Sequence, residues 1–132
     1  MAQNKQPLLL DSHVFIWALE QVEKLGEGTR QLLESGGRVY VSKVTLWELA
    51  IKYKAEKFPY NTSSLLEGLE SSGFSLLDIA ASHLEAYSSV RLPHKDPFDS
   101  LLIAQAITDR CMFITADRKL LDSAYAVHDA YR

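Results

Sequence analysis

The sequence has very little cysteine: Cys111 is the single one among 132 residues. An intrachain disulfide is therefore excluded, and nothing about the cysteine content indicates an oxidising compartment. Cys111 opens the apolar run CMFI, and no cysteine or histidine lies at ligand spacing from it. We expect it to be a small buried apolar residue.

Long hydrophobic runs are also missing. No apolar stretch approaches the roughly 20 residues that a helix needs to cross a bilayer. Near the start, PLLL follows Lys5, but Asp11 and His13 interrupt any signal-peptide core. We therefore expect a soluble cytoplasmic protein with no membrane partner.

Excess positive charge is absent as well. The formal net charge is −3 and the pI about 5.8, which argues against a broad basic DNA-binding face. A nucleic-acid enzyme is not excluded, because acids clustered at a metal site can outweigh a local basic rim. The 47% hydrophobic and 23% charged residues are typical of a folded chain. Without a linker or repeat, residues 1–132 are expected to form one domain.

Strand-like and helix-like segments alternate along the chain. Short apolar or β-branched runs predict strands at 7–10, 38–42, 74–79, 111–115 and 125–130. Helical patterns fill the intervals at 12–19, 21–37, 43–57, 61–73, 81–90, 98–110 and 117–124. The segment 21–37 is predicted to form one helix or a helix pair, ended by Gly36 and Gly37. This order predicts the α/β class, with a mainly parallel sheet covered by helices on both faces. Ligands of such folds bind beyond the carboxyl ends of the strands, where the strand order reverses.

Two acidic residues follow predicted strands. Asp11 comes directly after LLL, and Asp117 comes two residues after CMFIT. Each can cap the next helix or stand as a carboxylate at the mouth of the sheet. Thr115 offers a further oxygen at the second strand end, or a hydroxyl that bonds nearby backbone.

The stretch KDPFD contains a second acidic pair. Pro97 suits the first position of a helix, which makes Asp96 the cap and Asp99 the third helical residue. We expect the helix dipole to favour an ionised Asp99. Asp99 also lies on the apolar face of this helix, with Leu102, Ile103 and Ala106. An acid on such a face points to the interior or to a cleft and needs a partner.

Glu48 lies in the middle of a predicted helix, where capping cannot explain it. It falls at the edge of a predicted apolar stripe, made of Val44, Trp47, Ile51 and Ala55. A boundary ion pair with Lys52 is the structural alternative.

Convergence of these acids at one edge of the sheet would require positive charge. Carboxylates without cysteine or histidine partners favour a hard cation such as Mg²⁺ or Mn²⁺. Such an ion can activate water and stabilise a phosphoryl leaving group. Whether one or two ions would bind stays open.

Four stretches occur in a familiar order between residues 7 and 121: LLLDSHVFIWAL, VSKVTLWELAIK, HKDPFDSLLIAQA and FITADRKL. Together they resemble the PIN-domain ribonucleases, and most closely the VapC-type toxins of bacterial type II toxin–antitoxin pairs. The resemblance implies an α/β/α sandwich and an endoribonuclease that depends on Mg²⁺ or Mn²⁺. It also implies an RNA substrate, a cognate antitoxin whose C-terminal segment blocks the site, and a homodimer.

The resemblance carries over to particular residues. The catalytic acids of the family match Asp11, Glu48, Asp99 and Asp117, and the supporting positions match Ser12, Asp96 and Thr115. Ser12 replaces the usual threonine and keeps its hydroxyl. Ser100 replaces a residue that is often basic, which removes a salt bridge or a substrate contact.

The roles follow from that match. Asp11 and Asp99 are expected to be the main metal ligands, with Asp117 bound directly or through water, and Glu48 as a ligand or as the group that orients the attacking water. The products would carry a 5′-phosphate and a 3′-hydroxyl. Basic residues near the mouth either hold the RNA backbone or are simply solvated: Lys43, Lys95, Arg118 and Lys119.

Other functions are weaker fits. An aspartyl phosphatase with Asp11 as nucleophile would place a second acid where His13 stands. A receiver-like regulatory domain needs an acid beside Asp11 and an aspartate after a middle strand, where only Asp78 is found, within the strand. A protein-binding function is compatible with the nuclease, since an antitoxin would occupy the same groove as RNA.

Overall fold

The computed structural model describes residues 5–35 and 37–132. Its strands are β1 (Leu8–Leu10), β2 (Val39–Ser42), β3 (Ser75–Leu77), β4 (Met112–Thr115) and β5 (Val127–Asp129). The helices are α1 (Ser12–Glu20), the 3₁₀ turn η1 (Val22–Lys24), α2 (Glu27–Glu34), α3 (Lys43–Lys54), α4 (Thr62–Ser71), α5 (Ala81–Tyr87), α6 (Pro97–Thr108) and α7 (Arg118–Leu121). Each predicted strand and helix is found, and most are shorter at their ends. The segment 21–37 is split into η1 and α2, and Gly36, expected near its end, lies outside the described residues.

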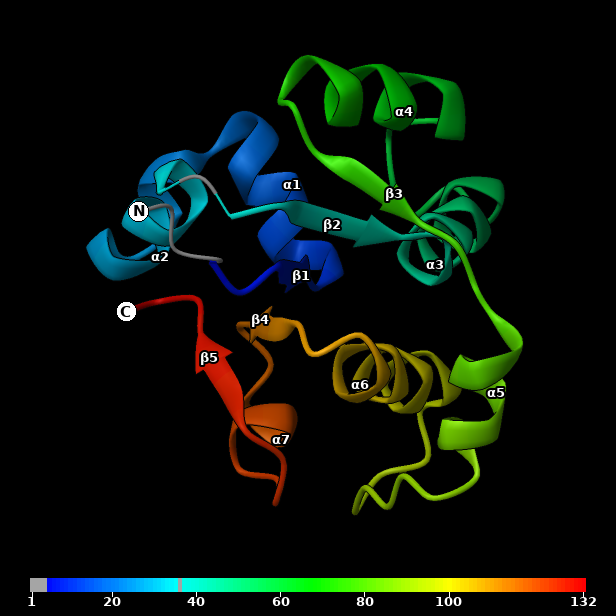
Figure 1. Ribbon diagram of the computed structural model, residues 1–132. Helices are drawn as coiled ribbons and strands as arrows, with labels where there is room; N and C mark the ends of the chain where they lie inside the picture. The colour runs from blue at the N-terminus through cyan, green and yellow to red at the C-terminus, as the bar shows by residue number, and fades with distance from the viewer. Residues whose placement is uncertain (1–4, 36) are drawn as a thin grey trace.

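The strands form one five-stranded sheet in the order β3-β2-β1-β4-β5, and every pairing is parallel. The central strand β1 is buried at each of its residues, because it has a neighbour on both sides and helices on both faces. Figure 1 shows this order, with α5 and α6 side by side beyond one face of the sheet. The predicted α/β/α sandwich is confirmed.

The side chains of β1 divide the core into two layers. Leu8 and Leu10 point into a cluster with residues of α1 and α4, among them Phe15 and Leu69. Leu9 points the other way, into a cluster with residues of α6 such as Leu102. This division follows from the alternation of side chains along a strand. No helix in the described ranges has the length and apolar character needed to span a bilayer.

Helix α3 departs from its predicted amphipathic pattern. Its buried residues are Val44, Thr45, Leu46 and Leu49. Trp47 and Ile51, expected on the buried stripe, are 59% and 45% exposed. Val44 is buried as predicted, but the rest of the stripe was wrong, because Leu46 and Leu49 pack into the cluster around Phe15 and Trp47 faces outward. The Trp47 ring instead meets Phe98 edge-on, with centroids 5.1 Å apart.

The strand order reverses at β1. The chain passes from β1 to β2 and β3 on one side, and later to β4 and β5 on the other. The main-chain N–H of Asp11 donates to the carbonyl of Ile114 at 3.0 Å, so the ends of β1 and β4 are directly joined. Residues after these two strands therefore share the crevice that the parallel topology opens.

Candidate active site

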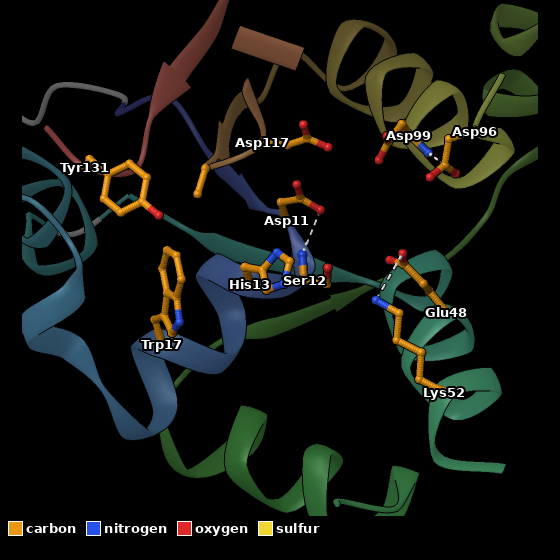
Figure 2. Close-up of a pocket in the computed structure, with 11 residues that line it drawn as sticks. Asp11, Ser12, His13, Trp17, Glu48, Lys52, Asp96, Asp99, Asp117 and Tyr131 are labelled. Atoms are coloured by element: carbon orange, nitrogen blue, oxygen red, sulfur yellow. Dashed lines mark hydrogen bonds and ion pairs between the residues drawn. The ribbon is translucent and has the colours of Figure 1, made fainter. Parts of the chain in front are cut away.

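A pocket of about 530 Å³ lies at this crevice and collects all five acids singled out in the sequence. They are Asp11, Glu48, Asp96, Asp99 and Asp117, and the wall is completed by Ser12, His13, Trp17, Lys52, Ala116 and Tyr131. Figure 2 shows the acids arriving from four places: the end of β1, the middle of α3, the start of α6 and the loop after β4. The predicted convergence is present in the structure.

Asp11 is the most enclosed of these acids, with 6% of its surface exposed. Its Oδ1 accepts from the main-chain N–H of Ser12 at 2.8 Å, and its Oδ2 accepts from the hydroxyl of Thr115 at 2.7 Å. Burial raises the pKa of the Asp11 carboxyl, while the bonds from Thr115 and Ser12 lower it. Asp11 is the cap of α1 and also a pocket carboxylate, so its two interpretations hold together.

Thr115 connects two of the acids. Its side chain is fully buried, donates to Asp11 and accepts from the main-chain N–H of Asp117 at 3.0 Å. Asp117 in turn caps α7 by accepting from the N–H of Lys119 at 2.9 Å. The Thr115 hydroxyl therefore orients the carboxylate of Asp11 and constrains the loop that carries Asp117.

Asp96 and Asp99 divide the two roles of the KDPFD stretch. Oδ1 of Asp96 accepts from the N–H of Phe98 at 2.9 Å and of Asp99 at 3.3 Å, which confirms the predicted cap. Asp99 is 7% exposed and shares its buried face with the predicted apolar residues of α6: Leu102, Ile103 and Ala106.

The pKa of Asp99 lies above the ordinary value of a carboxyl group. Burial raises its pKa to about 6, although the hydrogen bond from His94 acts in the opposite direction. The Nε2 of His94 lies 2.9 Å from Oδ2 of Asp99. The neighbouring charges of Asp96, Asp11 and Asp117 raise the pKa further. Desolvation and the neighbouring carboxylates therefore act against the predicted influence of the helix dipole, which favours the ionised form.

Glu48 faces the pocket from α3 and also forms the predicted pair with Lys52, at 3.8 Å. Burial raises the pKa of the Glu48 carboxyl, Lys52 lowers it, and the charges of Asp11, Asp96 and Asp99 add to the increase. The ion pair is therefore part of the pocket and does not remove Glu48 from it.

The pocket lining has more acidic than basic side chains. Against five carboxylates, the lining carries Lys52 and His13. Within the described part of the chain, no three potential ligands already lie close enough together to hold one ion. Each carboxylate is instead held by a hydrogen bond or ion pair to its own neighbours. The donor set is oxygen alone, which fits a hard divalent cation such as Mg²⁺ or Mn²⁺.

A second pocket of about 520 Å³ continues from the first. It shares Glu48, Lys52, Asp96, Asp99 and Asp117 and adds the basic residues His94, Lys95 and Lys119. Two of the expected RNA contacts thus stand beside the acids.

The other two expected contacts, Lys43 and Arg118, line neither of these pockets. Lys43 pairs with Asp78 at 2.6 Å, and Arg118 lies 3.9 Å from Asp122. Both basic side chains are largely exposed.

Trp17 and Tyr131 also line the pocket and were not anticipated from the sequence. Trp17 lies four residues after His13 on α1, a spacing that places both on one helical face and that would have indicated it. Tyr131 arrives from the far end of the chain, and no local pattern links it to the site.

Known proteins are similar to this chain in sequence. Residues 8–125 match the family model of the PIN domain. The curated Ribonuclease VapC22 of Mycobacterium tuberculosis is 28% identical over 116 residues, which cover 86% of this chain and 88% of that protein.

Solved structures share the fold. VapBC2 from Rickettsia felis, bound to a promoter DNA fragment, has a TM-score of 0.68 at 17% identity and covers 94% of this chain and 98% of its own. A toxin–antitoxin complex from Klebsiella pneumoniae has a TM-score of 0.65 at 21% identity, with the same two coverages of 94% and 98%. The family match spans most of the chain, and the chain therefore belongs to the PIN-domain family.

Proposed function

We propose that this PIN-domain protein is a metal-dependent endoribonuclease of the VapC type, the toxin of a type II toxin–antitoxin pair, with a single nuclease domain. The observation that carries the proposal is the gathering of five carboxylates in one pocket at the strand-order reversal. The similarity to a protein named as a ribonuclease supports RNA as the substrate.

Asp11 and Asp99 would be the main ligands of Mg²⁺ or Mn²⁺, with Asp117 bound directly or through water. Ser12 and Thr115 hold the Asp11 carboxylate by hydrogen bonds, so its oxygens are already oriented. Asp96 supports the site indirectly, because it caps the helix that presents Asp99. When bound, the cation supplies Lewis-acid activation of water and offsets charge that develops on the phosphate.

Glu48 would orient the attacking water. Its partly buried carboxyl faces the other acids across the pocket and is paired with Lys52 at 3.8 Å, so it can accept a hydrogen bond from a water held there. Lys95 and Lys119 would bind RNA phosphates next to the acids. Lys43 and Arg118 would reach a longer RNA only by exchanging their aspartate partners for phosphate.

We also propose protein partners for this chain. One structural relative is a toxin–antitoxin complex and another belongs to the VapBC family of toxin–antitoxin systems, which supports a cognate antitoxin for this chain. The C-terminal segment of the antitoxin would cover the acidic pocket and exclude RNA. We further propose a homodimer that acts in the cytoplasm.

Cleavage of RNA by purified protein tests the activity. Total RNA is incubated with Mg²⁺ or Mn²⁺, with and without chelator, beside Asp11→Asn and Asp99→Asn. Asp122→Asn is the matched control. The Asp122 side chain is 67% exposed, pairs with Arg118 at the end of α7, and does not line the acidic pocket. We expect cleavage by wild type and control alone, with 5′-phosphate ends. Cleavage that survives chelation, or that survives both pocket substitutions, would rule out the metal mechanism.

A further inference from the structure

One wall of the acidic pocket is aromatic. His13 and Trp17 are stacked with ring centroids 5.9 Å apart and planes at 29°. Tyr131 lies 5.7 Å from Trp17 with planes at 46°. Figure 2 shows Trp17 and Tyr131 at one end of the pocket, with Glu48, Lys52 and Asp96 at the other.

These rings are not needed to fill the core. Tyr131 is 57% exposed, His13 is exposed, and Trp17 is only partly buried against the core around Phe15. Their positions are nonetheless fixed. Helix α1 carries His13 and Trp17 one turn apart, and the main-chain N–H of Tyr131 donates to Oδ1 of Asp129 at 2.9 Å.

The chemistry of this wall differs from that of the rest of the site. The carboxylates repel phosphate, and the basic groups Lys95 and Lys119 lie in the adjoining second pocket. An aromatic ring can stack with any of the four nucleobases, because each base has a flat π-face. The base must be unstacked from its neighbours to offer this face to the protein. In a duplex the bases are already stacked on each other.

We propose that His13, Trp17 and Tyr131 form a stacking platform that holds an unpaired nucleobase next to the scissile phosphate. This inference rests on the proposed ribonuclease function. The strand crosses the acids with a base held on the aromatic side and phosphates held near Lys95 and Lys119 on the other.

The two tryptophans of the chain allow a matched test. Trp47→Phe leaves Trp17 as the reporter on the platform, and Trp17→Phe leaves Trp47, which lies against Phe98 and lines neither acidic pocket. Both are combined with Asp99→Asn to keep the RNA intact. Fluorescence is titrated with a ten-nucleotide single-stranded RNA, the same strand without bases, and its duplex.

We expect the single strand to quench Trp17 and leave Trp47 unchanged. The abasic strand keeps every phosphate but has no base, so it should not quench Trp17, and the duplex should quench weakly. Tyr131→Ala should weaken single-strand binding about 5- to 150-fold, the range for loss of one base–aromatic stack, while Tyr131→Phe keeps the ring and the affinity. Circular dichroism checks that each variant is folded.

Equal quenching by the abasic strand, or a response of Trp17 to cognate antitoxin and not to RNA, would overturn the platform. So would wild-type affinity in Tyr131→Ala and Trp17→Leu. If those variants also cleave normally while Asp11→Asn is inactive, the platform fails and the proposed nuclease stands. If Trp17 is quenched only by strands that carry bases, but no metal-dependent cleavage is found, the platform stands and the proposed nuclease fails.

Discussion

The hydroxyl of Thr115 donates to Oδ2 of Asp11 at 2.7 Å, across the ends of two neighbouring strands. These residues are 104 positions apart in the chain, and both are buried. The bond turns a carboxylate at the mouth of β1 into an oriented one, and it constrains the loop that carries Asp117.

Thr115→Val should lower both stability and metal affinity. Valine keeps the shape but leaves a buried oxygen of Asp11 without its donor, a loss that typically costs about 1–3 kcal/mol. The pKa of Asp11 should rise further, because the bond from Thr115 now lowers it. Urea unfolding and calorimetric titration with Mn²⁺ measure the two effects. Thr115→Ser retains the hydroxyl and should behave close to wild type; equal losses in both variants would contradict this role.

The stability of the metal-free protein should fall as pH rises from about 4 to 6. Asp99 has a folded pKa of about 6 against an ordinary value of 3.8, so the unfolded chain ionises first. Its stabilising contribution is complete below the lower value and is lost by the upper one. The raised pKa values of Asp11 and Glu48 act in the same direction.

Asp99→Asn isolates this effect. One pKa unit corresponds to about 1.4 kcal/mol, so the variant should gain up to about 3 kcal/mol over wild type at pH 7 and almost nothing at pH 4. Urea unfolding in chelator at several pH values measures the difference. A gain that is the same at both pH values would point to packing and not to charge.

Divalent cations should stabilise the folded protein. At a free Mn²⁺ concentration of 100 times Kd, ligand binding to the native state adds about 2.7 kcal/mol to the free energy of unfolding. The same addition should leave Asp11→Asn much less affected, since one of the proposed main ligands is lost. Thermal unfolding with and without chelator reports this. Equal stabilisation of Asp122→Asn and Asp11→Asn would place the ion elsewhere.

The buried amide of Gln105 is expected to hold α3 in place. Its Oε1 accepts from the hydroxyl of Ser42 at 2.6 Å, and its Nε2 donates to the carbonyl of Asp78 at 3.2 Å. Gln105→Leu should cost about 2–4 kcal/mol, because two buried or partly buried groups lose their partner. Ile107→Ala on the same helix, at a side chain 54% exposed, should change stability by less than about 0.5 kcal/mol. Chemical denaturation compares the pair.

The local features of the site were predictable from the sequence. Pro97 fixes the start of α6, so Asp96 had to be its cap and Asp99 had to share the face of Leu102. The spacing of Glu48 and Lys52 predicted their ion pair. These outcomes depend on residues within one helical turn, where backbone geometry alone sets the distances.

Long-range packing decided the rest. The helical period of α3 predicted that Trp47 and Ile51 are buried. In the structure Leu46 and Leu49 pack into the cluster around Phe15 instead, and Trp47 and Ile51 are exposed. The pKa of Asp99 is raised mainly by burial. The local charge of Asp96 adds to this increase, and so do the charges of Asp11 after β1 and Asp117 after β4, which only the fold brings near.

The sequence by itself determined the order of strands and helices along the chain and which acids stand at strand ends and helix starts, because periodicity and capping are local properties of the chain. Only the tertiary structure decided which of their oxygens are hydrogen-bonded, how much each carboxyl is desolvated, and that Tyr131 from the last turn meets Trp17 from the first helix. The physical reason is that burial and side-chain contacts depend on segments that are distant in the sequence and become neighbours only when the strands assemble into the sheet.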